Sequence, residues 1–403
     1  MTTATAAGDC PSITPSAPEG PAATVQVLAE KSDGTPKVSA AVYPRPDHPG
    51  NPWSQWGQGI VLPDGRFLSG MGDHLGIDGN SYVFVFEPET GKLTRFADVS
   101  AILSRPAGSY GYGKIHAQMV RVSCGEVVFG TYWGTRTGLT YGGPYTGDHL
   151  LSIHVATLRV RDLGVPVPGR GLPSLAGHDG LIYGEAVDPQ GRPQGQKGDS
   201  GAFFVYDTRS QKVIYRSDDQ RHLGFRNLAV DAAGRAFLAM ADGGLLRYDP
   251  GGELSVHSAR LPAGWLRAST SPARDGTVYA VTREPERYVA IRSDGRIDDL
   301  GPASGYVASM ALAPAENEFY VVPDAHGVAW QRGTPLVAVD VKTGHEREVV
   351  RLGPLVQQRL GLVANGSYDV AVDRTTGRVF VGLNAGVGKD KPWGEVVLAV
   401  VEP

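Results

Sequence analysis

The sequence predicts an all-β fold, a seven-bladed β-propeller. A short apolar run, a Gly/Asp/Asn turn, a second β-rich run, a loop and a closing hairpin recur seven times along 403 residues. Periods of about 40–60 residues with four strand signals each are typical of propeller blades. The 54 glycines and 29 prolines also favour many tight turns over long helices.

The turn between the first two strands is the clearest mark of each repeat, because glycine and short polar residues accept the backbone angles of a tight hairpin. These turns are Leu62–Gly65, Ser123–Gly125, His178–Gly180, Ala233–Gly234, Arg274–Gly276, Ala315–Asn317 and Thr375–Gly377. The blades are predicted near residues 57–99, 115–164, 172–217, 225–257, 266–300, 307–352 and 368–400.

The last repeat has three strand signals, at residues 368–373, 378–383 and 395–400. Near the start, Thr24–Glu30 alternates between apolar and polar residues and has no neighbouring strand signal. We expect this N-terminal strand to complete the last blade, because closure of the ring removes two open strand edges. Six or eight blades stay open as alternatives. Residues 24–403 are predicted to form a single domain, preceded by a flexible leader at residues 1–23.

Charge and composition narrow the choice of partners. The formal net charge of −4 gives no basic footprint for nucleic acid. No stretch reaches the ~18 apolar residues that a membrane span requires. Cys10 and Cys124 do not make a disulfide scaffold, although a bridge between them is feasible in an oxidising compartment. No signal peptide is visible, so we expect a cytoplasmic or a trimmed secreted protein.

We label the four strands of a blade A to D, from the innermost to the outermost. The candidate site residues gather at one mouth of the propeller, because the loops between strands B and C and the connections from strand D to the next strand A meet there. His116 begins an inner strand and Tyr132 ends the next, so both are expected at one rim as a proton-transfer pair. Arg136 and Arg226 could bind a substrate carboxylate through the planar guanidinium fork. Further residues that could bind substrate are Tyr112, Lys114, Trp133, His149, His222, Asn227, Arg267 and Tyr368.

Two Gly-Asp-His copies, at residues 72–74 and 147–149, have two interpretations. They could bind a metal, or the aspartate could cap a turn at a fixed position in the blade, which the repetition favours. The chain has no His-x-His or His-Glu-x-x-His spacing. The cofactor therefore stays unknown, with a divalent metal (calcium, manganese or zinc) as an open alternative.

Two short runs carry a resemblance to a known family. The run Gly113-Lys114-Ile115-His116, followed by Gly130-Thr131-Tyr132-Trp133-Gly134, resembles the seven-bladed polysaccharide lyases that act on uronate-containing glycans, such as ulvan and oligogalacturonate lyases. The architecture is similar over residues 57–403, and the motifs over residues 110–136.

The resemblance implies β-elimination of a uronate-containing oligosaccharide or glycoside, that is, of an acidic carbohydrate substrate. His116 would be the base or the acid, Tyr132 its partner, and Arg136 or Arg226 the carboxylate contact. The ulvan lyases use paired histidines in this region, whereas here Tyr132 and Trp133 end the strand and the next histidine is His149.

Two alternatives to a lyase stay open. A non-catalytic binding propeller would need no proton-transfer pair at the rim. A lactonase-like, metal-dependent hydrolase would need oxygen ligands that converge on the inner strands, where Asn227 and Asp369 are available.

Overall fold

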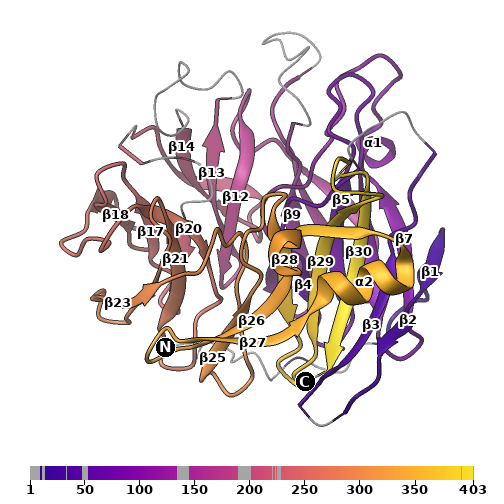
Figure 1. Ribbon diagram of the computed structural model, residues 1–403. Helices are drawn as coiled ribbons and strands as arrows, with labels where there is room; N and C mark the ends of the chain where they lie inside the picture. The colour runs from indigo at the N-terminus through magenta and orange to yellow at the C-terminus, as the bar shows by residue number, and fades with distance from the viewer. Residues whose placement is uncertain are drawn as a thin grey trace.

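The computed structural model describes residues 10, 14–32, 34–47, 53–133, 145–188, 201–219, 221–222, 224, 228–391 and 393–402. Within these ranges the strands form seven antiparallel sheets (Figure 1). The predicted all-β, seven-bladed propeller is therefore confirmed. No helix in the described ranges is both long enough and apolar enough to cross a bilayer.

The first six blades are meanders of strands A to D, numbered outward from the channel. Blade 1 holds β4 (Ile60–Val61), β5 (Phe67–Gly72), β6 (Ser81–Glu87) and β7 (Lys92–Asp98). Blade 2 holds β8 (Val120–Ser123), β9 (Glu126–Gly130), β10 (Leu150–His154) and β11 (Val160–Gly164). Blade 3 holds β12 (Gly171–His178), β13 (Leu181–Val187), β14 (Gly201–Asp207) and β15 (Lys212–Ser217).

The next three blades repeat the pattern. Blade 4 holds β16 (Leu228–Val230), β17 (Ala236–Ala239), β18 (Leu245–Tyr248) and β19 (Leu254–Val256). Blade 5 holds β20 (Trp265–Ser269), β21 (Val278–Arg283), β22 (Arg287–Ile291) and β23 (Ile297–Pro302). Blade 6 holds β24 (Ala311–Leu312), β25 (Glu318–Val321), β26 (Pro335–Asp340) and β27 (Glu346–Arg351).

Blade 7 is closed by the N-terminal part of the chain, but by a later strand than the sequence suggested. Its inner strands are β28 (Val363–Val372), β29 (Val379–Gly386) and β30 (Glu395–Glu402). The fourth strand is β3 (Lys37–Val42), which pairs with β30 from Lys37↔Glu402 to Val42↔Val397. The predicted segment supplies β2 (Gln26–Ala29), a fifth strand outside β3. Figure 1 shows the indigo β3 and β2 beside the yellow β30.

The prediction was wrong about the closing strand because Lys37–Val42, which lies between Pro36 and Pro44, has a weaker strand pattern than Thr24–Glu30. Both prolines lie outside the strand, and Val38, Ser39, Ala40 and Ala41 inside it are buried. A run of mostly small residues carries a weak strand signal by itself, whereas burial between two strands stabilises it.

The predicted flexible leader is partly attached to the propeller. β1 (Ala22–Thr24) pairs with β7 as a fifth strand of blade 1. Ser16 donates its backbone N–H to the Ala156 carbonyl at 2.8 Å. Cys10 forms a disulfide with Cys124, the bridge that the sequence left open. The N-terminal segment is therefore linked to blades 1 and 2.

The core lies between blades. Each of the seven blade interfaces has its own cluster of buried apolar side chains in the described residues. At the interface between blades 7 and 1, the rings of Phe67 and Phe380 stack with centroids 4.9 Å apart. Asp369 accepts hydrogen bonds from the Gly59 backbone at 2.8 Å and from the Gln55 side chain, which joins the same two blades. The inner carboxylate considered for a lactonase therefore takes part in ring closure.

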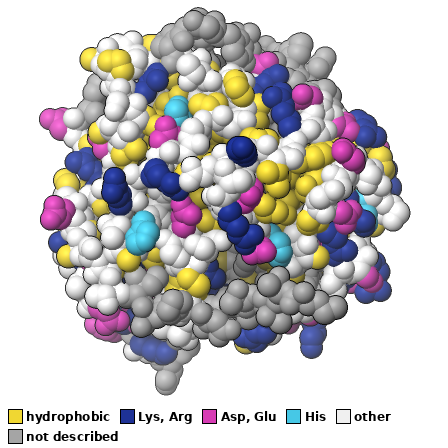
Figure 2. Space-filling model, turned by 180° about the vertical axis from the view of Figure 1, so that it is seen from behind, with side chains coloured by type: hydrophobic (Ala, Val, Ile, Leu, Met, Phe, Trp, Pro, Cys, Tyr) yellow, Lys and Arg dark blue, Asp and Glu magenta, His cyan; other side chains and the backbone are white. Residues whose placement is uncertain are grey.

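Short helices occupy three connections. They are α1 (Val99–Ile102), the 3-10 turn η1 (Ala329–Arg332) and α2 (Leu352–Leu360). α2 packs against β28, β2 and β26, and Figure 1 shows it in front of the strands of the last blades. Basic and acidic side chains are interspersed on the face drawn in Figure 2.

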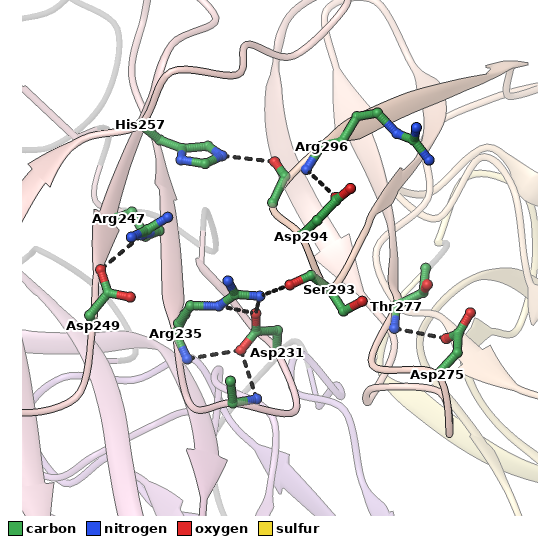
Figure 3. A network of polar contacts seen from close by, with 12 residues as sticks. Asp231, Arg235, Arg247, Asp249, His257, Asp275, Thr277, Ser293, Asp294 and Arg296 are labelled. Atoms are coloured by element: carbon green, nitrogen blue, oxygen red, sulfur yellow. Dashed lines mark hydrogen bonds and ion pairs between the residues drawn. The ribbon is translucent and has the colours of Figure 1, made fainter.

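The A–B and C–D turns meet at one mouth, which we call the turn face. Asp231 accepts backbone hydrogen bonds from Ala233 and Arg235 at 2.9 Å each, and its other oxygen lies 2.6 Å from Arg235 Nε. The same guanidinium donates to the Ser293 carbonyl of blade 5. Figure 3 shows this network between blades 4 and 5. Neutralised charges thus connect adjacent blades at this mouth.

Candidate functional site

The B–C loops and D–A connections meet at the opposite mouth, which we call the loop face. Lys114 precedes the inner strand of blade 2 and Tyr132 follows its second strand. The two residues form an antiparallel bridge, with backbone N···O distances of 3.2 and 2.8 Å. His116 and Tyr132, predicted at one rim, are thereby brought together.

His116 and Tyr132 form a ring pair. Their centroids are 4.7 Å apart with an interplanar angle of 31°. The Trp133 ring stacks on the Tyr132 ring, and their centroids are 3.9 Å apart. His116 Nδ1 lies 3.1 Å from the Pro173 carbonyl of blade 3. A carbonyl can only accept, so the neutral ring carries its proton on Nδ1 and Nε2 is the proton-accepting atom.

An aromatic cluster supports this rim. We call it the Tyr132 cluster; it comprises Tyr110, Tyr112, Tyr132, Trp133 and Tyr145, all buried. Behind it, Asp148 accepts hydrogen bonds from the Thr131 and Tyr145 hydroxyls, both at 3.0 Å. Burial raises the pKa of Asp148 to about 7, because these donors and the Leu172 N–H offset only part of the desolvation. Asp148, the aspartate of the second Gly-Asp-His copy, therefore has a structural role and supports the Tyr132 cluster.

A second aromatic cluster lies across the mouth, on blades 1, 6 and 7. We call it the Trp56 cluster; it comprises Trp56, Tyr306, His326, Tyr368 and Trp393. The centroid of Trp56 is 4.8 Å from that of Tyr368 and 5.6 Å from that of Trp393. His326 Nδ1 lies 2.5 Å from the Tyr368 hydroxyl. Half-buried indole rings at a channel mouth offer stacking surfaces for a ligand.

Lys114 lies between the two clusters. Its Nζ is 5.1 Å from the ring centroid of Trp56 and 6.0 Å from that of Tyr132. Both distances are within the range of cation–π attraction. A positive charge is therefore placed where the two aromatic surfaces converge.

Two arginines extend this arrangement to blade 5. The Arg267 guanidinium is 5.1 Å from the Tyr306 centroid and 6.0 Å from that of Tyr368. Its Nε donates to the Tyr306 hydroxyl at 2.5 Å. Arg283 lies 4.8 Å from the same Tyr306 ring. Together with Lys114, these cations and burial lower the pKa of His326, with burial as the largest cause.

The first Gly-Asp-His copy also has a structural role. Asp73 accepts the N–H groups of Leu75 and Asn80 at 2.9 and 2.7 Å, which caps the loop. His74 packs on Trp56 with centroids 4.9 Å apart. Burial, with a smaller contribution from Lys114, lowers the pKa of His74 to about 3, so this ring is neutral at physiological pH. In the described part of the chain, no three His, Cys, Asp or Glu side chains cluster as a metal site would require.

Three of the other predicted substrate-binding residues contact groups of the protein itself. Tyr112 is fully buried and donates its hydroxyl to the Gly147 carbonyl at 2.9 Å. His149 Nδ1 lies 3.0 Å from Asp162. His222 is buried with its Nδ1 3.5 Å from Glu185. Arg136, Arg226 and Asn227 lie outside the described residues, so their predicted roles stay predictions.

Several members of the loop face were not predicted as site residues. They are Trp56, Arg283, His326 and Trp393. Trp56 and Trp393 could have been found, because tryptophans beside glycines in loops of adjacent blades are candidates for an exposed ring. His326 and Arg283 carried no such signal.

The comparisons with known proteins support the propeller fold alone. No protein-family model and no curated protein matches the sequence. Among solved structures, the chain is similar to a streptogramin B lyase, with 11% identity, a TM-score of 0.55, and 90% of this chain and 98% of that chain covered. The WD40 β-propeller domain of Doa1 gives 11% identity, a TM-score of 0.53, and coverage of 90% and 95%. A chain of the mitotic checkpoint complex is similar with 11% identity and a TM-score of 0.55, and 96% of each chain is covered.

Proposed function

We propose that this protein is a lyase that cleaves a uronate-containing glycan by β-elimination. The observation that carries the proposal is the His116–Tyr132 ring pair, with centroids 4.7 Å apart and a tilt of 31° between the rings, at a mouth where cations lie over aromatic rings. β-Elimination needs a base and an acid close together, and an acidic sugar needs positive charge beside a stacking surface.

The proposed reaction assigns one proton transfer to each member of the pair. Nε2 of His116 removes the proton on C5, α to the uronate carboxylate. The electron pair forms the C4=C5 double bond, and the bond from C4 to the glycosidic oxygen breaks. The departing oxygen takes a proton from the Tyr132 hydroxyl. The Pro173 carbonyl, 3.1 Å from Nδ1, holds the imidazole in the tautomer that this role requires.

The surroundings of the pair favour an acidic carbohydrate as substrate. Negative charge develops on the carboxylate as the C5 proton leaves, and a fixed cation stabilises that charge. Lys114 has its ammonium group 6.0 Å from the Tyr132 ring. Trp56 and Trp393 provide flat surfaces on which a sugar ring can stack. Arg136 and Arg226 remain candidates for further contacts with the carboxylate.

The first experiment incubates the full chain with a panel of uronate-containing polysaccharides and glycosides and follows the ultraviolet absorbance. β-Elimination creates a conjugated, unsaturated uronate, so absorbance should rise with at least one substrate. The panel is repeated with a chelator, and a loss of activity would place a divalent metal in the reaction.

His116→Ala is the matched control for the panel. We expect it to lower the rate about 10²–10⁴-fold, the usual contribution of general base catalysis. Its melting temperature should remain near that of the wild type. Equal turnover by wild type and variant would remove His116 from the reaction. If absorbance stays flat over the whole panel while a glycan still binds, the protein is a binding propeller instead.

A further inference from the structure

The inner strand of blade 5 carries a buried guanidinium that forms no ion pair with any acidic side chain among the described residues. Arg267 is 3% exposed. Its hydrogen bond goes to the neutral Tyr306 hydroxyl, and among the described residues Nη1 has no hydrogen-bond partner. No ion pair in the described part of the chain includes Arg267. An uncompensated buried charge is costly, so such a group in a fold points to a counter-ion from outside.

Arg66 shows what a buried arginine normally has in this molecule. It is 4% exposed, almost as buried as Arg267. Its Nη2 lies 2.7 Å from the Asp64 carboxylate and donates to the Val155 carbonyl at 2.7 Å. The two arginines are equally buried, but within the described residues only Arg66 has a carboxylate beside its guanidinium. The difference therefore depends on where each arginine lies in the fold.

A cavity lies beside this guanidinium. Arg267 lines a space of about 30 Å³ in the channel, together with residues from blades 1 to 6 that include Gln118, Leu228 and Ala308. A cavity needs about 10–15 Å³ to hold one water molecule, so this space accepts a chloride ion or a carboxylate group but not a sugar ring. Two polar residues that line the space donate hydrogen bonds to protein groups: Gln58 to the Val370 carbonyl and Ser174 to the Glu185 carboxylate.

We propose that Arg267 is the anion-binding residue of the channel and that its ligand is a carboxylate. The guanidinium contacts both the cavity and the Tyr306 and Tyr368 rings of the Trp56 cluster. An anion bound to it thus lies next to the stacking surfaces of the loop face. The identification of the carboxylate as that of a uronate rests on the proposed function, whereas the anion site itself does not.

The test measures thermal stability without reference to activity. The full chain is melted in a bulky zwitterionic buffer with increasing sodium acetate, formate or chloride. We expect the melting temperature of the wild type to rise with anion concentration, because a ligand that binds only the folded state stabilises it. Arg267→Met should abolish this rise and, without anion, should melt no lower than the wild type, since a lone buried charge has been removed.

Arg66→Met is the matched control. This substitution leaves the Asp64 carboxylate without its arginine partner, so the variant should melt at a lower temperature than the wild type at every anion concentration. Its melting temperature should still rise with anion concentration. The proposal is overturned if no small anion stabilises the wild type, or if Arg267→Met keeps the full response. If Arg267→Met does not fold, Arg267→Lys replaces it. The loss of the planar fork should then weaken acetate binding at least tenfold, and an unchanged midpoint overturns the proposal.

A second pair of ligands separates a sugar carboxylate from a free small anion. Galacturonate should stabilise the wild type and not Arg267→Met, whereas galactose at the same concentration should have no Arg267-dependent effect. A response to acetate without a response to galacturonate overturns the sugar assignment. Galacturonate binding that needs Arg267, in a protein that cleaves no uronate glycan, would keep the site and reject the lyase function.

Discussion

Two cations at the loop face, Lys114 and Arg267, differ from two arginines at the turn face, Arg66 and Arg235, in what their charged groups contact. At the turn face, arginines lie against carboxylates: Arg235 contacts Asp231, and Arg66 contacts Asp64 at 2.7 Å. At the loop face, Lys114 and Arg267 lie over aromatic rings at 5.1 Å from Trp56 and Tyr306, respectively. Arg235 and Arg66 also donate to backbone carbonyls of a neighbouring blade, so these two pairs stabilise contacts between blades. Lys114 and Arg267 lie beside the aromatic surfaces of the candidate binding site.

The same contrast holds for two buried aspartates. Asp231 at the turn face accepts from the charged Arg235 side chain as well as from backbone N–H groups. Asp148 at the loop face accepts from the neutral Thr131 and Tyr145 hydroxyls. Burial without a strong cationic partner raises the pKa of Asp148 to about 7. Position in the fold, rather than residue type, sets the chemistry of each carboxyl group.

The largest effect is expected from the removal of one hydroxyl at the loop face. Tyr132→Phe should lower the rate of uronate elimination about 10²–10⁴-fold if the hydroxyl is the general acid, and should leave the melting temperature nearly unchanged. Tyr215→Phe is the control, because its hydroxyl bonds Glu253 and Leu254 on the outer strands of blades 3 and 4. Loss of activity in both variants, or in neither, would contradict the assignment.

A carboxylate at the turn face should behave in the opposite manner. Asp231→Ala leaves the Arg235 guanidinium without its partner and removes two turn hydrogen bonds. We expect the free energy of unfolding to fall by about 2–3 kcal/mol, as measured by urea denaturation. The rate per folded molecule should not change. A large loss of catalytic rate with full stability would mean that the two mouths are not independent.

Asp148 should make stability depend on pH. Since its folded pKa of about 7 lies above the unfolded value, the folded state binds more protons between about pH 4 and pH 7. The free energy of unfolding of the wild type, relative to Asp148→Asn, should therefore decrease by about 2 kcal/mol from pH 5 to pH 7. Urea titrations of both proteins at a series of pH values measure this difference. Parallel curves would show that Asp148 is ionised throughout that range.

The smallest expected effect concerns the stacking surface. Trp56→Ala should raise KM about tenfold, equivalent to about 1.4 kcal/mol, with a smaller change in kcat. Trp56→Phe keeps a flat ring and should recover most of the affinity. An unchanged KM in the alanine variant would place the substrate away from the Trp56 cluster.

The sevenfold repeat follows from local sequence signals. Alternating apolar runs and Gly/Asp turns specify strands and hairpins locally, so all seven blades and the use of an N-terminal strand for closure could be predicted. The meeting of His116 and Tyr132 at one rim could be predicted too, because it follows from the register of one antiparallel pair. These features depend on neighbours in the chain.

Only the tertiary structure decided the features that depend on distant segments. The closing strand Lys37–Val42 is specified by its partner β30, about 360 residues away, and not by its own weak strand signal. The clustering of Trp56 with Tyr368 and Trp393 arises because ring closure brings blades 7 and 1 together. That Arg267 has no acidic partner among the described residues could also be learned only from the fold, because no local sequence pattern distinguishes a paired buried charge from an unpaired one.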